Sequence, residues 1–107
     1  LLFGERLGLD QMQMVNVLAD GAGGSRMLAV RGPVMAKRSW SDAAMKVDVW
    51  QKDMHIISEA LHEARVPAPL FAATVPIYLA ALAQDHALDD TAAVYAVLER
   101  LAGGAHP

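Results

Sequence analysis

The sequence contains no cysteine, few aromatic residues and only a small excess of acidic over basic side chains. Without cysteine, the chain can form neither a disulfide framework nor a thiolate site, which suits a cytoplasmic protein. A net charge of −3 gives no basic surface for a polyanion, so we expect no nucleic-acid partner. No basic segment followed by an apolar run marks a signal peptide at the start. These absences favour a cytoplasmic location.

A glycine-rich dinucleotide fingerprint is also absent. No Gly-x-Gly-x-x-Gly motif follows a strand-like segment, although Rossmann domains use this motif to bind the pyrophosphate of a dinucleotide. The stretch 21–25 is glycine-rich and precedes a predicted helix, so its free amides could bind a phosphate. It lacks a preceding strand and a P-loop lysine, and a plain connection between helices is therefore the favoured interpretation.

One uncharged run is long enough to raise the question of a membrane span. Residues 66–84 carry no charged side chain, which is about the length that a bilayer crossing requires. The run contains Pro67, Pro69 and Pro76 and is rich in alanine. We therefore expect a buried core helix and no membrane association.

The remaining pattern is helical throughout, without a convincing period-two strand. A chain of 107 residues with 54% hydrophobic content fits one domain with a single core. Asp10 and Ser25 are placed to cap helices, and Ser41 or Asp42 is placed to begin a long one. We predict an all-α, compact helical bundle formed by residues 1–107 as a single domain. The predicted helices span residues 1–7, 11–18, 25–32, 33–38, 41–65, 69–84 and, capped by Asp89 or Asp90, the stretch to about Leu101.

The long predicted helix has a carboxylate on its apolar face. At about 100° per residue, Asp53 falls near the middle of an arc of apolar side chains, and Lys52 falls at the edge of this arc. A buried carboxylate is costly unless it is paired or hydrogen-bonded. Asp53 therefore needs a fixed partner or faces something outside this chain, and Lys52 and Asp53 become candidate site residues.

The same residues resemble a known enzyme family. Lys52 to Glu59 is similar to the KDLGLAxD-type motif of the β-hydroxyacid dehydrogenases, which include 3-hydroxyisobutyrate dehydrogenase, tartronate semialdehyde reductase and L-threonate dehydrogenase. The resemblance extends over nearly the whole chain. It includes residues 2–10, which resemble the end of the family's interdomain helix, residues 25–40, and the helix openings at 66–70 and 90–94.

The resemblance implies the C-terminal helical domain of such an enzyme, with a fold like that of 6-phosphogluconate dehydrogenase C-terminal domains. It implies NAD or NADP as cofactor, a small hydroxy acid as substrate and a homo-oligomer. Lys52 would face the cofactor, and Asp53 would accompany it in binding there. The family's Rossmann domain and its catalytic Lys and Asn would lie upstream of Leu1, so we expect the isolated chain to be inactive. Where the family often has an aromatic residue before the Lys52 helix, this chain has Ala44.

Other interpretations stay open at this point. The chain could be a non-catalytic helical dimerisation or interaction module, or a small-ligand binding bundle. By spacing alone, Lys52 could be a surface lysine paired with Asp48 or Glu59. His55, Glu59 and His62 share a helix face and could bind a metal, although a solvated face is favoured. Trp40 and Trp50 could stack on a nicotinamide, but for Trp50 core packing is favoured.

Overall fold

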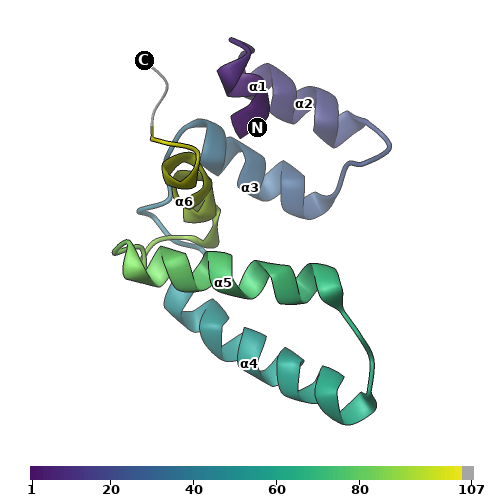
Figure 1. Cartoon of the computed structure of the whole chain (residues 1–107). Coiled ribbons are helices and arrows are strands. Elements are labelled where there is room, and N and C mark those ends of the chain that lie inside the picture. Colours follow the sequence, from purple (N-terminus) through teal and green to yellow (C-terminus); the bar gives the residue numbers. More distant parts are fainter. Residues whose placement is uncertain (105–107) are drawn as a thin grey trace.

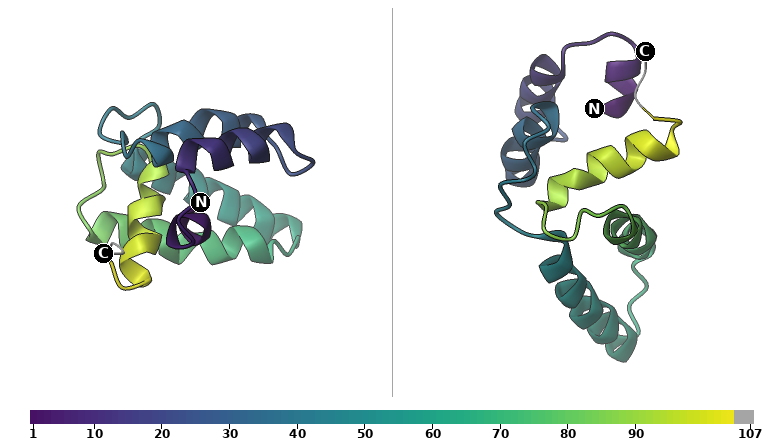
Figure 2. Two further views of the ribbon diagram at one scale, coloured as in Figure 1. Left: turned by 90° about the horizontal axis from the view of Figure 1, so that it is seen from above. Right: turned by 90° about the vertical axis from the view of Figure 1, so that its left-hand side faces the viewer.

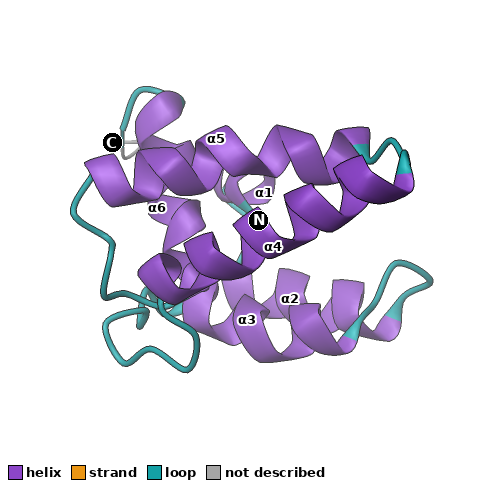
Figure 3. Cartoon of the chain, turned by 90° about the horizontal axis from the view of Figure 1, so that it is seen from below, coloured by secondary structure: helices purple, strands orange, loops and turns teal. Residues whose placement is uncertain are grey.

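The computed structural model describes residues 1–104, and Figure 3 shows that the regular secondary structure of this part is helical. An isolated antiparallel bridge joins Lys46 to Asp90. The predicted all-α fold is confirmed. The elements are α1 (Leu2–Arg6), α2 (Gln11–Asp20), α3 (Arg26–Ala36), α4 (Val47–Ala64), α5 (Pro69–Ala83), the 3-10 helix η1 (Thr91–Ala93) and α6 (Val94–Leu101).

Two of the predicted helix starts are confirmed by their capping bonds. The Asp10 carboxylate accepts a hydrogen bond from the backbone N–H of Gln13 at 2.9 Å, and the Ser25 hydroxyl accepts one from Leu28 at 3.0 Å. Each bond satisfies one of the N–H groups that a helix start leaves without an intrahelical partner. Local sequence therefore determines where α2 and α3 begin.

Two helix pairs lie at opposite ends of the structure, with α6 between them. The pair α2–α3 with α1 forms one end, and the pair α4–α5 forms the other (Figure 1, and the right-hand view of Figure 2). Helix α6 packs against α5 and α1, while η1 packs against α3. In the α2–α3 pair, Gly32 approaches Val15 so closely that an added Cβ would lie 2.8 Å from a Val15 methyl carbon.

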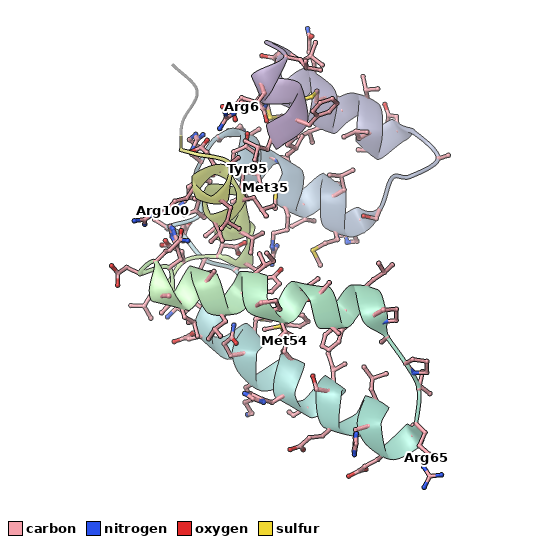
Figure 4. The ribbon with its side chains drawn as sticks, viewed as in Figure 1. Arg6, Met35, Met54, Arg65, Tyr95 and Arg100 are labelled. Carbon is pink, nitrogen blue, oxygen red and sulfur yellow. The ribbon has the colours of Figure 1, made fainter. Side chains whose placement is uncertain are left out.

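The hydrophobic core is small and lies where the start of α4 meets α5 and α6. Val47, Ala81 and Val97 are fully buried there, and Ile77 and Tyr78 pack against them. The rest of α4 runs away from this core alongside α5, as Figure 4 shows by the positions of Met54 and Arg65. The core therefore secures one end of α4 and leaves much of its length near the surface.

A polar network joins α1 to α6. The Tyr95 hydroxyl donates to the Glu5 carboxylate, and Arg38 forms ion pairs with Glu99 and, at 3.6 Å, with Glu5. The Arg38 guanidinium also lies over the Tyr95 ring, 5.4 Å from its centroid. Burial and the bond to Glu5 raise the pKa of Tyr95, so this side chain remains a neutral donor at physiological pH.

The predicted start of the long helix was wrong. Helix α4 begins at Val47, and residues 41–46 form turns and bends that are hydrogen-bonded to a loop about fifty residues later. The N–H of Asp90 donates to the Trp40 carbonyl at 2.7 Å, and the N–H of Thr91 donates to the Met45 carbonyl at 2.9 Å. Residues so distant in sequence leave no local signal.

The predicted break near Pro33 was also wrong. The two short helices predicted on either side of it form one helix, α3, with Pro33 inside. Proline has a helical φ and removes one N–H donor, so a helix can continue through it at a cost. The close contact between Gly32 and Val15 holds this part of α3 against α2.

Asp90 is the centre of the pairing between the two loops. Its side chain is almost fully buried and accepts hydrogen bonds from the N–H groups of Ala44 at 3.0 Å, Met45 at 3.1 Å and Ala92 at 2.9 Å. The Nε of Arg31 lies 3.0 Å from the same carboxylate. Burial raises the pKa of Asp90, but the three N–H donors and Arg31 outweigh it and hold this pKa below its usual value.

No helix in residues 1–104 has both the length and the apolar composition needed to cross a bilayer. The uncharged run that raised this question forms α5, which packs against α4 and α6.

We predict that Asp90→Ala lowers the free energy of unfolding by about 3–5 kcal/mol at pH 7, because it leaves Arg31 and three N–H donors without their acceptor. Urea unfolding of the two proteins would measure the difference. The full difference in unfolding free energy is present above pH about 4, the pKa of an aspartate in the unfolded chain. It decreases as the pH falls through the lower pKa that Asp90 has in the folded state. Asp42→Ala, at an exposed loop position, is the control. A loss below about 1 kcal/mol would contradict this account of Asp90.

Candidate functional site

The first turn of α4 is capped by a distant loop. Lys46 occupies the N-cap position without a side-chain capping bond. Instead, the N–H of Val47 donates to the Asp89 carbonyl at 2.9 Å, and the N–H of Asp48 donates to the Ala87 carbonyl at 3.0 Å. These bonds satisfy donors that a helix start otherwise leaves free. Together with the Asp90 bonds, they fix the position and direction of the helix that carries Lys52.

The structure places both predicted site residues on α4, close to its anchored end. Lys52 is exposed and Asp53 is half-buried. Within residues 1–104, neither side chain forms a hydrogen bond or an ion pair. The ion pairs from Lys52 to Asp48 or Glu59, which the surface-lysine interpretation requires, are therefore not formed.

Asp53 lies in an uncovered apolar stripe. Val49, Ile56 and Ile57 lie one helical turn before or after Asp53 on the same face, and they are 48%, 55% and 36% exposed. The opposite part of the predicted apolar arc is covered, since Met54 is buried. One half of the arc therefore packs against other parts of this chain. The other half, which contains Asp53, is exposed to solvent in the described structure.

The two tryptophans have different surroundings. The Trp50 ring packs edge-on against Tyr78 at 6.2 Å, as the core interpretation of Trp50 predicts. Its buried indole N–H has no hydrogen-bond partner in the described part of the chain, which costs about 1–3 kcal/mol. Trp40 packs edge-on against His86 at 6.5 Å, next to Arg38.

Two other sequence features gain no support as sites. His55, Glu59 and His62 are all exposed on α4, and no cluster of three potential metal ligands occurs in residues 1–104. The glycine-rich stretch 21–25 connects α2 to α3, and Ser25 at its end caps α3. This stretch therefore serves as a turn between paired helices.

Several polar contacts in the fold join residues that are far apart in sequence and were not predicted. Asp90 was predicted to cap a helix, but its bonds to Ala44, Met45 and Arg31 were not, because these residues lie 45 to 59 positions away. The contact of Tyr95 with Glu5 was not predicted either. An arginine in a mainly apolar helix is a signal that could have indicated a buried partner for Arg31.

Comparison with known proteins agrees with the resemblance found in the sequence. Residues 1–98 match the family model described as "NAD-binding of NADP-dependent 3-hydroxyisobutyrate dehydrogenase". The chain belongs to this family. The predicted cofactor, NAD or NADP, is confirmed at the level of the family.

A curated relative gives the same indication. The chain is 28% identical over 94 residues to L-threonate dehydrogenase of Cupriavidus necator. This alignment covers 88% of the chain and 31% of the relative. The chain thus spans about a third of the length of the curated relative that it matches.

Asp53 has no hydrogen-bond or ion-pair partner among the described residues, so its removal should not destabilise the chain. We predict that Asp53→Ala raises the free energy of unfolding by about 0.3–1 kcal/mol, because alanine has the higher helix propensity and no unpaired charge remains on the stripe. Urea unfolding measures this change, with the exposed Asp48→Ala as a matched control on the same helix. A loss of more than about 1 kcal/mol would show that Asp53 has a stabilising partner within the chain.

Proposed function

We propose that this chain is the C-terminal helical domain of an NAD(P)-dependent 3-hydroxyacid dehydrogenase, in which a Rossmann domain and a catalytic helix precede it. The observation that carries the proposal is the pair Lys52–Asp53 on α4. Both side chains lack partners among the described residues, both lie at an uncovered face, and the helix that presents them is anchored by Asp90. The family match and the one-third coverage of L-threonate dehydrogenase support it.

The residues of this chain fit a position beside the cofactor. The Lys52 ammonium has three N–H donors and no acidic partner among the described residues, so it can meet a polar or anionic part of a bound dinucleotide. The uncovered stripe of Val49, Ile56 and Ile57 can close one wall of the cleft and exclude water. Asp53, within this stripe, orients the helix surface against the same partner.

The chemistry of the proposed parent is reversible hydride transfer. Bound NAD(P) would supply the hydride acceptor for the carbinol carbon of a short hydroxy acid, and an upstream lysine would serve as general acid and base. Residues of this chain position the cofactor and shield it from water. The isolated chain therefore turns over no hydroxy acid. We place the parent in the cytoplasm.

The surface of the chain suits assembly. Its accessible surface is 7168 Å², whereas a folded monomer of this mass exposes about 5,800 Å². The excess is comparable to the area that a specific protein interface buries. Large apolar side chains are exposed on several helices, among them Phe3, Val17 and Ile56. These surfaces also favour the second candidate function, a helical dimerisation module without a catalytic parent.

The role of Lys52 can be tested in the full-length protein. We predict that Lys52→Ala raises the cofactor KM or lowers turnover by about 1–3 kcal/mol, the range of a hydrogen bond to a charged group, and leaves the melting temperature unchanged. The exposed Lys37→Ala is the matched control, and the 107-residue chain alone gives the background rate. Unchanged kinetics would show that Lys52 is an ordinary surface lysine. A loss of activity with a matching fall in melting temperature would show that its role is structural.

We also predict that the isolated chain forms a dimer or a larger symmetric assembly at micromolar concentration, because exposed apolar surface of this extent finds a partner. A net charge of −3 opposes association weakly at physiological salt, where the Debye length is about 8 Å. Light scattering measures the mass. A value near 11.4 kDa at about 100 μM, unchanged on dilution, would contradict the prediction.

A further inference from the structure

A pocket lies between the two helix pairs, away from Lys52. Its volume is about 300 Å³, and it is lined by residues of α3, α4, α5, η1 and the loop before α4: Met27, Arg31, Met45, Trp50, Tyr78 and Thr91. Trp50 and Lys52 are two positions apart on α4, which places them on nearly opposite sides of the helix. The pocket therefore lies on the side of α4 away from Lys52, next to the uncovered stripe, because Asp53 is one helical turn after Trp50.

Arg31 gives the pocket a directed set of donors. Its side chain is 16% exposed, and its Nε lies 3.0 Å from Asp90 and 3.3 Å from the Thr91 hydroxyl. These contacts hold the guanidinium in place through its Nε. The two terminal nitrogens have no hydrogen-bond partner in residues 1–104, so four N–H donors remain for an acceptor in the pocket.

Two aromatic residues complete the polar part of the lining. The Tyr78 hydroxyl has no hydrogen bond to the described residues, and burial raises its pKa while Arg31 opposes the rise. Tyr78 is therefore a neutral phenol that can donate. Trp50 packs edge-on against Tyr78, and its buried indole N–H is unpartnered within residues 1–104.

Charge and shape define the class of ligand. Arg31 and Asp90 nearly cancel each other, so a dianion such as phosphate would meet the Asp90 charge without full compensation. A carboxylate carries one charge, and its two oxygens match the geometry of a guanidinium edge. Met27, Met45 and Trp50 give the rest of the pocket an apolar wall. A volume near the lower limit for ligand sites requires a ligand of few atoms.

We propose that this pocket binds a small monocarboxylate with an apolar body. The carboxylate accepts hydrogen bonds from the terminal nitrogens of Arg31 and from the Tyr78 hydroxyl. The apolar body lies against the methionines and Trp50. Nothing in this assignment depends on the catalytic parent, because every residue involved lies within the chain.

The test is an NMR titration of the ¹⁵N-labelled 107-residue chain with benzoate. The chain has two tryptophans, and Trp40→Phe assigns their two indole N–H signals. We expect the Trp50 indole signal to shift in a saturable manner with a Kd of about 1 mM or tighter, while the Trp40 signal stays in place. Benzamide, which keeps the ring without the charge, and acetate, which keeps the charge without the ring, should each bind at least about tenfold more weakly.

Matched variants separate a specific site from general binding. Arg31→Lys keeps a cation beside Asp90 but removes the guanidinium edge, and we expect benzoate to bind about tenfold more weakly. Arg26→Lys, at an exposed position on the same helix, should leave the Kd within about twofold. Tyr78→Phe removes only the hydroxyl and should weaken binding about three- to tenfold, which provides a second test if Arg31→Lys fails to fold.

Two results would overturn the proposal. One is a Trp50 indole signal that does not move in about 20 mM benzoate, since a site of the expected affinity would be nearly saturated. The other is binding of benzamide with the same Kd as benzoate, or a Kd unchanged in both Arg31→Lys and Tyr78→Phe. Either would show that the guanidinium edge and the phenol do not form a carboxylate site.

Discussion

The fold depends on one buried carboxylate, Asp90. It accepts hydrogen bonds from Ala44 and Met45 in the loop before α4 and from Ala92 in η1, and it forms an ion pair with Arg31 of α3. Three parts of the chain that are far apart in sequence therefore meet at a single side chain. A buried ion pair stabilises a fold only where further hydrogen bonds satisfy both charges, and Asp90 meets this condition with three backbone donors. Because the hydrophobic core is small, this polar junction determines how the two helix pairs are arranged around α6 (Figure 1).

The same junction determines the position and direction of α4. Its first turn is fixed by the loop that contains Asp90, and its far half runs along α5 with one apolar face uncovered. A helix held in this way presents Lys52 and Asp53 at a defined place, although neither residue stabilises the chain through any contact with the described residues. Such an arrangement is expected where a domain contributes charge and apolar surface to a cleft whose other wall belongs to another part of the protein. Under the proposed function, the same arrangement would account for a helical chain without a glycine-rich fingerprint in a family named for NAD binding.

Sequence alone predicted the parts of this structure that depend on neighbouring residues. The caps of α2 and α3 at Asp10 and Ser25 and the all-α fold follow from local patterns, and the structure confirms them. The apolar arc predicted for α4 is only partly inward, since Met54 is buried but Ile56 and Ile57 are exposed. The start of α4 could not be predicted, because the acceptors for its first N–H groups belong to Asp89 and Ala87. The partners of Asp90 were missed for the same reason. Asp53 on an apolar arc predicted a carboxylate in need of a partner, but periodicity could not show whether that partner lies inside or outside the chain.

The claim that α4 presents Lys52 to the cofactor can be tested directly by chemical modification of the full-length protein. This chain has three lysines, Lys37, Lys46 and Lys52, and all three are exposed. Acetylation followed by mass spectrometry would measure the reactivity of each one with and without saturating NADP or NAD. The account predicts that the cofactor slows acetylation of Lys52 about tenfold or more and leaves Lys37 and Lys46 unchanged, because only Lys52 would be covered. Equal reactivity of Lys52 with and without cofactor would contradict it.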